Sequence, residues 1–106
     1  MKKIENELII SIVQKGYSHL VVESARSAGA SGSTIVGGRG SGIHENEKIL
    51  GISIEPEKEL VLTLVPSSIK KDVMKAILKG TNLSEPGNGI CFSLPVLDVE
   101  GINHKN

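Results

Sequence analysis

The segment Lys58-Glu59-Leu60-Val61-Leu62-Thr63-Leu64-Val65 is the clearest β-strand in the chain. Aliphatic and β-branched residues fill it, and Pro66 ends it because proline cannot donate to a strand ladder. From Ile69 to Lys79 the apolar residues recur every three or four positions, which predicts an amphipathic helix. The predicted ends of this helix are Ser67 or Ser68 as the N-cap and Gly80 as the residue that stops it.

A similar strand, helix and strand precede this segment. We expect a strand over Leu8–Val13, a helix over Tyr17–Ala28 and a strand over Ser33–Val36, and Ile90–Val96 supplies the last strand. Ser18 is the expected N-cap of the first helix, and Gly29 is the expected residue after its end. The order β-α-β, loop, β-α-β predicts an α+β, ferredoxin-like split βαβ fold, with both helices on one face of an antiparallel sheet.

The chain has 106 residues, so we expect residues 1–106 to form a single domain. The strands are apolar on both faces, and the chain is too short to cover the second face itself. We therefore expect a homo-oligomer. Residues 37–57 are expected to be a loop with one extended piece, Ile49–Ile54.

Two glycine-rich segments are candidates for a binding site: Arg39-Gly40-Ser41-Gly42 and Glu85-Pro86-Gly87-Asn88-Gly89. Glycine lets a ligand approach the backbone, and consecutive amides can bind an anion. The arginine fork matches a phosphate or a carboxylate. Turn geometry alone explains Gly29 and Gly32 equally well, and an ordinary β-turn remains open for the second segment.

The composition argues against several classes of function. The 12 basic residues equal the 12 acidic ones, and aromatics make up 2% of the chain, so neither the charge nor the stacking rings of a nucleic-acid binder are present. No apolar run approaches the roughly 20 residues of a membrane span. The first residues turn acidic before any apolar segment, unlike a signal peptide, so we expect a cytoplasmic protein.

No catalytic set is visible in the sequence. No serine or cysteine has a neighbouring histidine and carboxylate, so we expect that the protein is not an enzyme. Cys91 lies in an apolar run and is interpreted as a buried structural thiol. The histidines are scattered without metal-ligand spacing, although His44 lies beside Glu45 and Glu47 and leaves a metal contact open against a solvated loop residue.

Several motifs together resemble the PII-like signalling family, the nitrogen-regulatory P-II proteins and their relatives, over nearly the whole chain. They are Gly29-x-x-Gly32-x-Thr34, Arg39-Gly40-Ser41-Gly42, Leu64-Val65-Pro66 and Pro86-Gly87-Asn88-Gly89. The resemblance implies a ferredoxin-like fold, a compact homotrimer and adenine nucleotides or other small effectors bound in clefts between subunits. It also implies that the family's T-loop, here residues 41–57, docks on a transporter, an enzyme or a transcription regulator.

The resemblance also implies which residues bind the ligand. Gly32, Thr34 and Leu64 would lie near an adenine. The phosphates would meet Gly40 and Gly42 at the base of the T-loop, Gly87 and Gly89 in the second glycine segment, and the basic residues Arg39 and Lys58. For Lys58, a local ion pair with one of the neighbouring glutamates is the alternative.

The chain departs from the family pattern where cations are usual. Ile90 replaces a phosphate-binding lysine, and Gly101 and Asn103 replace two arginines. His44 replaces the usual T-loop glutamine, and the T-loop is shorter and carries no tyrosine, which excludes uridylylation. The implied effector is ATP, ADP, AMP or a related nucleotide, or a less charged anion, held mainly by backbone amides and Arg39.

The leading functional hypothesis is a regulator that senses a small anionic effector and acts on a protein partner, in nitrogen regulation or in control of a membrane transporter. The alternative is a trimeric metal-binding protein of the divalent-cation tolerance type, which has the same fold. A purely structural trimer is the third reading.

Overall fold

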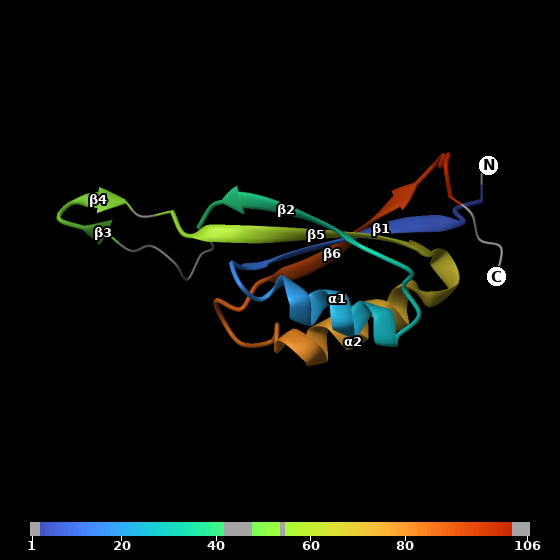
Figure 1. The fold of residues 1–106 in the computed structure, drawn as a ribbon, viewed down its shortest axis with the longest axis horizontal. Helices are drawn as coiled ribbons and strands as arrows, with labels where there is room; N and C mark the ends of the chain where they lie inside the picture. The colour runs from blue at the N-terminus through green and yellow to red at the C-terminus, as the bar shows by residue number, and fades with distance from the viewer. Residues whose placement is uncertain (1–2, 42–47, 54, 103–106) are drawn as a thin grey trace.

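A computed structural model describes residues 3–41, 48–53 and 55–102. The elements are β1 (Asn6–Gln14), α1 (Ser18–Ser27), β2 (Thr34–Arg39), β3 (Lys48–Ile49), β4 (Ile52–Ser53), β5 (Glu57–Pro66), a 3₁₀ turn η1 (Ser67–Ile69), α2 (Lys70–Thr81) and β6 (Ile90–Val96). The main sheet has the order β2-β5-β1-β6, and every neighbouring pair is antiparallel. Both helices lie on one side of it (Figure 1), which confirms the predicted ferredoxin-like α+β fold.

The core lies between the sheet and the two helices. Alternate residues of β1 and β5 point toward the helices, and the helix residues at three- and four-residue spacing meet them. The buried hydrophobic residues are Ile9, Val13, Val21, Ala25, Ala30, Val61, Val65, Val73 and Ile77. All of them are aliphatic, so this core is held by close packing of valine, isoleucine and alanine, and each valine or isoleucine contributes about 1.5–3 kcal/mol when fully buried.

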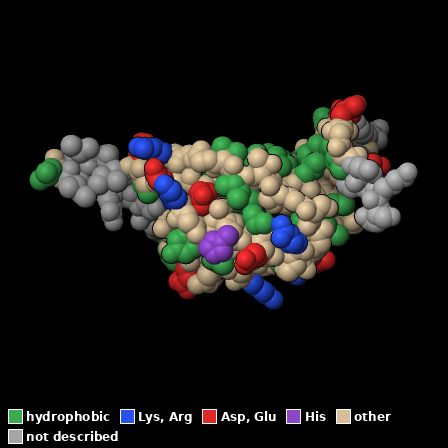
Figure 2. Space-filling view, viewed as in Figure 1, with side chains coloured by type: hydrophobic (Ala, Val, Ile, Leu, Met, Phe, Trp, Pro, Cys, Tyr) green, Lys and Arg blue, Asp and Glu red, His purple; other side chains and the backbone are tan. Residues whose placement is uncertain are grey.

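The other side of the sheet, here called the open face, is also apolar. Strands β1, β5 and β6 contribute rows that are aligned by the strand register: Leu64-Leu8-Leu94, Leu62-Ile10-Phe92 and Leu60-Ile12-Ile90. Ile90 is 55% exposed and Leu94 is 46% exposed. Hydrophobic side chains are visible along the upper margin of the molecule, above the sheet (Figure 2). The sequence expectation that the strands are apolar on both faces is therefore confirmed.

The N-terminal end of α1 differs from the prediction. The prediction that Ser18 is the N-cap was wrong: the N-cap is Tyr17, which makes no side-chain cap bond, and Ser18 is the first helical residue. The carboxylate of Glu59 instead accepts the backbone N–H groups of Gly16 at 2.8 Å and Ser18 at 3.4 Å. A carboxylate at a helix N-terminus also interacts favourably with the helix dipole.

At its C-terminus, α1 ends as predicted. Gly29 has φ +109° and follows the C-cap residue Ala28. The backbone N–H groups of Gly29 and Ala30 donate to the carbonyls of Arg26 and Ala25, both at 3.0 Å, which is the Schellman pattern.

Neither predicted end of α2 was correct. Ser67 does not cap the helix, because its N–H donates to the carbonyl of Glu5 and its hydroxyl donates to that of Ile4; the N-cap is Ile69. Gly80 does not end the helix, which continues to Thr81 before Asn82 adopts a left-handed conformation with φ +55°. A Cβ atom on Gly80 would collide with the side chain of Ser24 on α1, so this glycine allows the two helices to approach closely.

The predicted extended piece Ile49–Ile54, of which Ile54 lies outside the described residues, folds back on itself. β3 and β4 form a separate hairpin, and its two turn residues, Leu50 and Gly51, have φ +53° and +80°. Positive φ at both positions is the mark of a type I′ turn. Because β2 continues to Arg39 and β5 begins at Glu57, the connecting segment, here called the arm, spans residues 40–56. The hairpin projects beyond the end of the sheet (Figure 1). In the part of the chain that the structure describes, no helix is long and apolar enough to span a bilayer.

Candidate functional site

A cleft of about 380 Å³ lies at the base of the arm, where β2 ends and β5 begins. The turn that follows β1 forms its third side. The residues that line this arm-base cleft are Lys15, Gly37, Gly38, Arg39, Glu57, Lys58 and Glu59. Arg39 and Lys58 were predicted as ligand-binding residues from the sequence, and the structure places both in the wall of one cleft.

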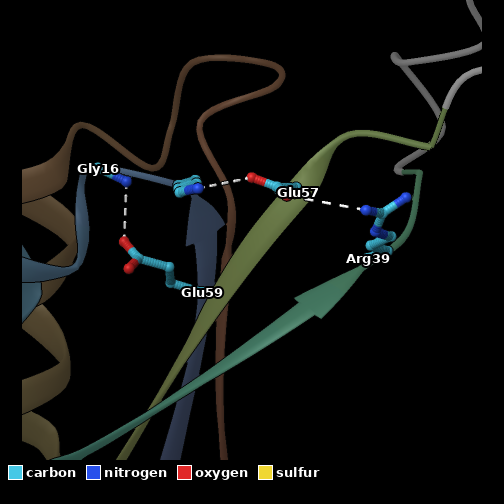
Figure 3. A network of polar contacts seen from close by, with 5 residues as sticks. Gly16, Arg39, Glu57 and Glu59 are labelled. Atoms are coloured by element: carbon cyan, nitrogen blue, oxygen red, sulfur yellow. Dashed lines mark hydrogen bonds and ion pairs between the residues drawn. The ribbon is translucent and has the colours of Figure 1, made fainter.

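Glu57 lies between two basic side chains of this cleft (Figure 3). Its Oε2 is 2.9 Å from Nζ of Lys15, and its Oε1 is 3.8 Å from Nη2 of Arg39. The hydrogen bond and the charge of Lys15 lower the pKa of Glu57, and the same bond raises the pKa of Lys15. Glu57 is therefore ionised at neutral pH and bridges the turn after β1 to the end of β2.

Glu59 has a structural role in the same cleft. Its carboxylate accepts the backbone N–H groups at the start of α1, and the bond from Gly16, with further bonds from Ser18, lowers the pKa of Glu59. Gly16 lies in the turn after β1 and Glu59 lies on β5, so this hydrogen bond holds the turn of Lys15 and Gly16 against β5.

Replacing Glu59 with glutamine should make stability less sensitive to acid. A carboxyl group whose pKa is lowered by folding stabilises the native state above its ordinary pKa of 4.5, and this contribution is lost as the pH falls through the native value. When the pH is lowered from about 6 to about 3, the urea concentration at the unfolding midpoint should decrease for the wild type. It should decrease less for Glu59→Gln. Glu23→Gln on the exposed side of α1 is the control. Parallel curves for the wild type and Glu59→Gln would contradict this role.

Backbone hydrogen bonds fix the base of the arm. The N–H of Gly40 donates to the carbonyl of Pro56, and the N–H of Lys15 donates to that of Glu57, both at 3.2 Å. A Cβ atom built on Gly37 or on Gly40 would meet nothing within 4 Å. Packing within the chain therefore does not require glycine at either position, and the bare backbone leaves room for a ligand.

The second glycine segment reaches the same end of the sheet. The side chain of Gln14, the last residue of β1, donates to the carbonyl of Gly87 at 2.9 Å, and Gln14 is the register partner of Lys58. Gly87 has φ +86° and open space around it. Gly89 has φ +129°, and a side chain there would collide with the carbonyl oxygen of Ile12. Gly89 is thus required for the contact of this segment with β1.

The remaining predicted site residues lie elsewhere. Thr34 is paired with Leu62 at the opposite end of β2 from Arg39, and five residues along a strand span roughly 17 Å. Gly32 precedes that strand, and Leu64 lies on the open face opposite Leu8. Of the other positions discussed for the site, Gly42, His44 and Asn103 lie outside the described residues, Ile90 is on the open face, and Gly101 is exposed with φ +85°. The chain therefore brings together Arg39, Gly40, Lys58 and Gly87 and separates them from Gly32, Thr34 and Leu64.

Sequence reasoning missed three residues of this region: Gln14, Lys15 and Glu57. Each is an ordinary polar residue at a strand end, without a motif around it. Only the pairing of β1 with β5, which aligns residues more than forty positions apart, places them at the arm base. The only sequence signal that could have indicated Glu57 was its position next to Lys58 at the start of a predicted strand.

The single cysteine is half-buried rather than fully buried. The hydroxyl of Ser11 donates to Sγ of Cys91 at 3.6 Å, and burial raises the pKa of the thiol. Cys91 also lines a more apolar cleft of about 370 Å³ between α2 and β6, together with Met74, Lys75, Leu78, Leu83, Gly89 and Ile90. Residues 3–41, 48–53 and 55–102 contain no group of three or more side chains placed to hold a metal ion.

Comparison with known proteins identifies the family. The family model described as nitrogen regulatory protein P-II matches residues 6–106. A solved structure described as Arabidopsis thaliana PII bound to citrate has the same fold, with a TM-score of 0.73 and 23% identity over 92% of this chain and 83% of the other. A search of curated protein sequences found no match. P-II proteins are signalling regulators and not enzymes, as the sequence predicts for this chain. The chain belongs to the nitrogen regulatory protein P-II family.

Proposed function

We propose that this protein is a homotrimeric regulator that senses a small anionic effector at the arm-base cleft and acts through the arm on a protein partner. The observation that carries the proposal is the meeting of Arg39 and Lys58 with open glycine backbone at the point where the arm leaves the sheet. An effector held there contacts both strands that support the arm, so its binding can change how the arm is presented.

The chemistry of the cleft favours an anion. Arg39 offers a planar fork of donors, and Gly87 and Gly89 in the second glycine segment offer backbone amides. Citrate, which the solved Arabidopsis protein carries, and ATP, ADP or AMP have acidic groups of this kind. In a nucleotide complex, we place the phosphates at the arm base of one copy and the adenine toward Gly32, Thr34 and Leu64 of a neighbouring copy. Because Ile90 stands where the family usually has a lysine, the amides and Arg39 would carry most of the binding.

The open face supports the homotrimer. Three rows of aliphatic and aromatic side chains cross β1, β5 and β6 on the side away from both helices. Contiguous apolar surface of this kind marks an interface, and identical copies can cover it. Assembly through this face would bring the sheets of neighbouring copies together, and it would place effector sites near subunit boundaries.

The arm is the proposed contact with the partner. It corresponds to the predicted T-loop at residues 41–57, and its hairpin projects beyond the sheet (Figure 1). Leu50 in the hairpin turn is 96% exposed. We propose a membrane transporter as the first partner to test, in the cytoplasm and in the context of nitrogen regulation.

Replacing Arg39 with alanine should weaken the binding of the effector by about 1.5–3 kcal/mol, since it removes a charge-assisted contact. Titration calorimetry with citrate and with ATP measures this directly. Lys71→Ala, on the exposed side of α2, is the control and should bind like the wild type. Equal affinity of Arg39→Ala and the wild type would place the ligand elsewhere. Tight binding of a divalent metal ion without any anion would favour the metal-binding alternative.

A further inference from the structure

The cleft contains its own carboxylate between two cations. Glu57 holds one oxygen against Lys15 at 2.9 Å and the other toward Arg39 at 3.8 Å. This is the arrangement that a carboxylate or phosphate group of a bound molecule would adopt, since two of its oxygens would face two positive charges. Figure 3 shows Glu57 on β5, with one contact toward the turn after β1 and the other toward Arg39 at the end of β2.

The two contacts of Glu57 are easy to replace. The side chains of Lys15, Arg39 and Glu57 are 68%, 70% and 49% exposed, and exposed ion pairs contribute little to folding stability. The contact with Arg39 is long, and a guanidinium carries five donors, more than one carboxylate can accept. Displacing Glu57 therefore sacrifices little native stability and exposes two cations on opposite sides of the cleft.

The other carboxylate of the cleft is not replaceable in the same way. Glu59 is held by backbone N–H groups at the start of α1, which no mobile ligand can take over without opening the turn. The backbone N–H of Lys15, in contrast, donates to the carbonyl of Glu57, so the main chain at Lys15 stays beside β5 when the side chain of Glu57 leaves, and the lysine side chain can still reach the cleft.

We infer that Lys15 and Arg39 form a two-cation subsite, which Glu57 occupies when no ligand is bound and which an anionic effector takes by displacing Glu57. The ligand class is a small molecule with a carboxylate or phosphate group. Glu57 follows Pro56, whose carbonyl accepts the N–H of Gly40. Its displacement therefore occurs beside the backbone contact that joins the two ends of the arm. This inference rests on the proposed function. It adds Lys15 as a residue that binds the effector and Glu57 as a side chain that competes with the effector for the same two cations.

The test is titration calorimetry of the full chain with citrate and, separately, with ATP at low salt. Glu57→Gln removes the competitor and should bind about fivefold more tightly than the wild type. Lys15→Gln should bind about tenfold more weakly. In the Lys15→Gln background the gain from Glu57→Gln should shrink, because the two side chains then no longer share a contact. A preference for citrate identifies a carboxylate ligand, and a preference for ATP identifies a phosphate ligand.

Glu55→Gln is the matched control, because it changes the net charge equally two residues away and does not line the cleft. It should stay within about twofold of the wild type. Unchanged or weaker binding by Glu57→Gln would overturn the inference. If Arg39→Ala weakens binding while Lys15→Gln and Glu57→Gln do not alter it, the proposed function stands and this inference fails. If neither anion binds the wild type or any variant, both fail.

Discussion

Replacing Ile10 with aspartate should convert the assembly to monomers of 11.2 kDa. Ile10 lies in the centre of the open face, between its register partners Leu62 and Phe92. In the proposed trimer the new carboxylate would be buried without a partner, which costs at least about 3–5 kcal/mol in each copy. In a monomer the same carboxylate faces water. The core between the sheet and the helices is untouched, so the monomer should stay folded.

Sedimentation velocity measures the mass, and far-ultraviolet circular dichroism reports the fold. Lys71→Asp adds the same side chain on the exposed side of α2 and should leave the assembly intact. Phe92→Asp, on the edge strand β6, is a second variant in case Ile10→Asp does not fold. Folded trimers of both open-face variants would show that this face is not the interface, and a wild-type monomer would contradict the trimer itself.

Replacing Gly89 with alanine should lower the free energy of unfolding by about 2–5 kcal/mol. The backbone at Gly89 has φ +129°, a conformation that costs a residue with a side chain about 1–2 kcal/mol. A Cβ atom would also collide with the carbonyl oxygen of Ile12 and lie 3.2 Å from Cγ1 of Val13. Overpacking of that kind adds roughly 1–3 kcal/mol, since β1 is a central strand that cannot shift without disturbing both neighbours.

Gly87→Ala is the matched control in the same segment. Gly87 also has positive φ, but a Cβ atom there meets nothing within 4 Å, so only the conformational cost of about 1–2 kcal/mol applies. Urea unfolding curves of the two variants separate the clash from the backbone strain. An equal decrease in the free energy of unfolding for both variants would show that β1 can shift to accommodate the Cβ atom. The contact with Ile12 would then not be the reason that residue 89 is glycine.

The fold could be predicted from local patterns because those patterns repeat along whole elements. The segment over Lys58–Val65 is a short run of aliphatic and β-branched residues that ends at a proline, and the helix period over Ile69–Lys79 is unambiguous. The helix ends could not be predicted in the same way. Ser18 has the right residue type for an N-cap, but Glu59, which is distant in the sequence, takes that function. Gly80 has the right residue type for a helix end but is needed for the contact with Ser24.

The candidate site was predictable only where its residues carry a local signal. Arg39 and Gly40 stand out because a turn requires glycine but does not require the neighbouring arginine, whose side chain can bind an anion. Lys58 stands out because it begins a clear strand. Lys15 and Glu57 form an ion pair of 2.9 Å in the cleft, yet nothing near either residue in the sequence indicates it. Their pairing depends on the register between β1 and β5, which a sequence specifies only through the assembled sheet.

The most direct test of the account is a nuclear magnetic resonance titration of the ¹⁵N-labelled protein with citrate and with ATP. Effector binding at the arm base predicts that the largest amide shift changes fall on Gly37–Gly40, Lys15, Glu57–Glu59 and Gly87, while amides on the exposed side of α2, such as Lys71, do not move. Changes centred on the apolar cleft between α2 and β6, or an unchanged spectrum with both anions, would contradict it.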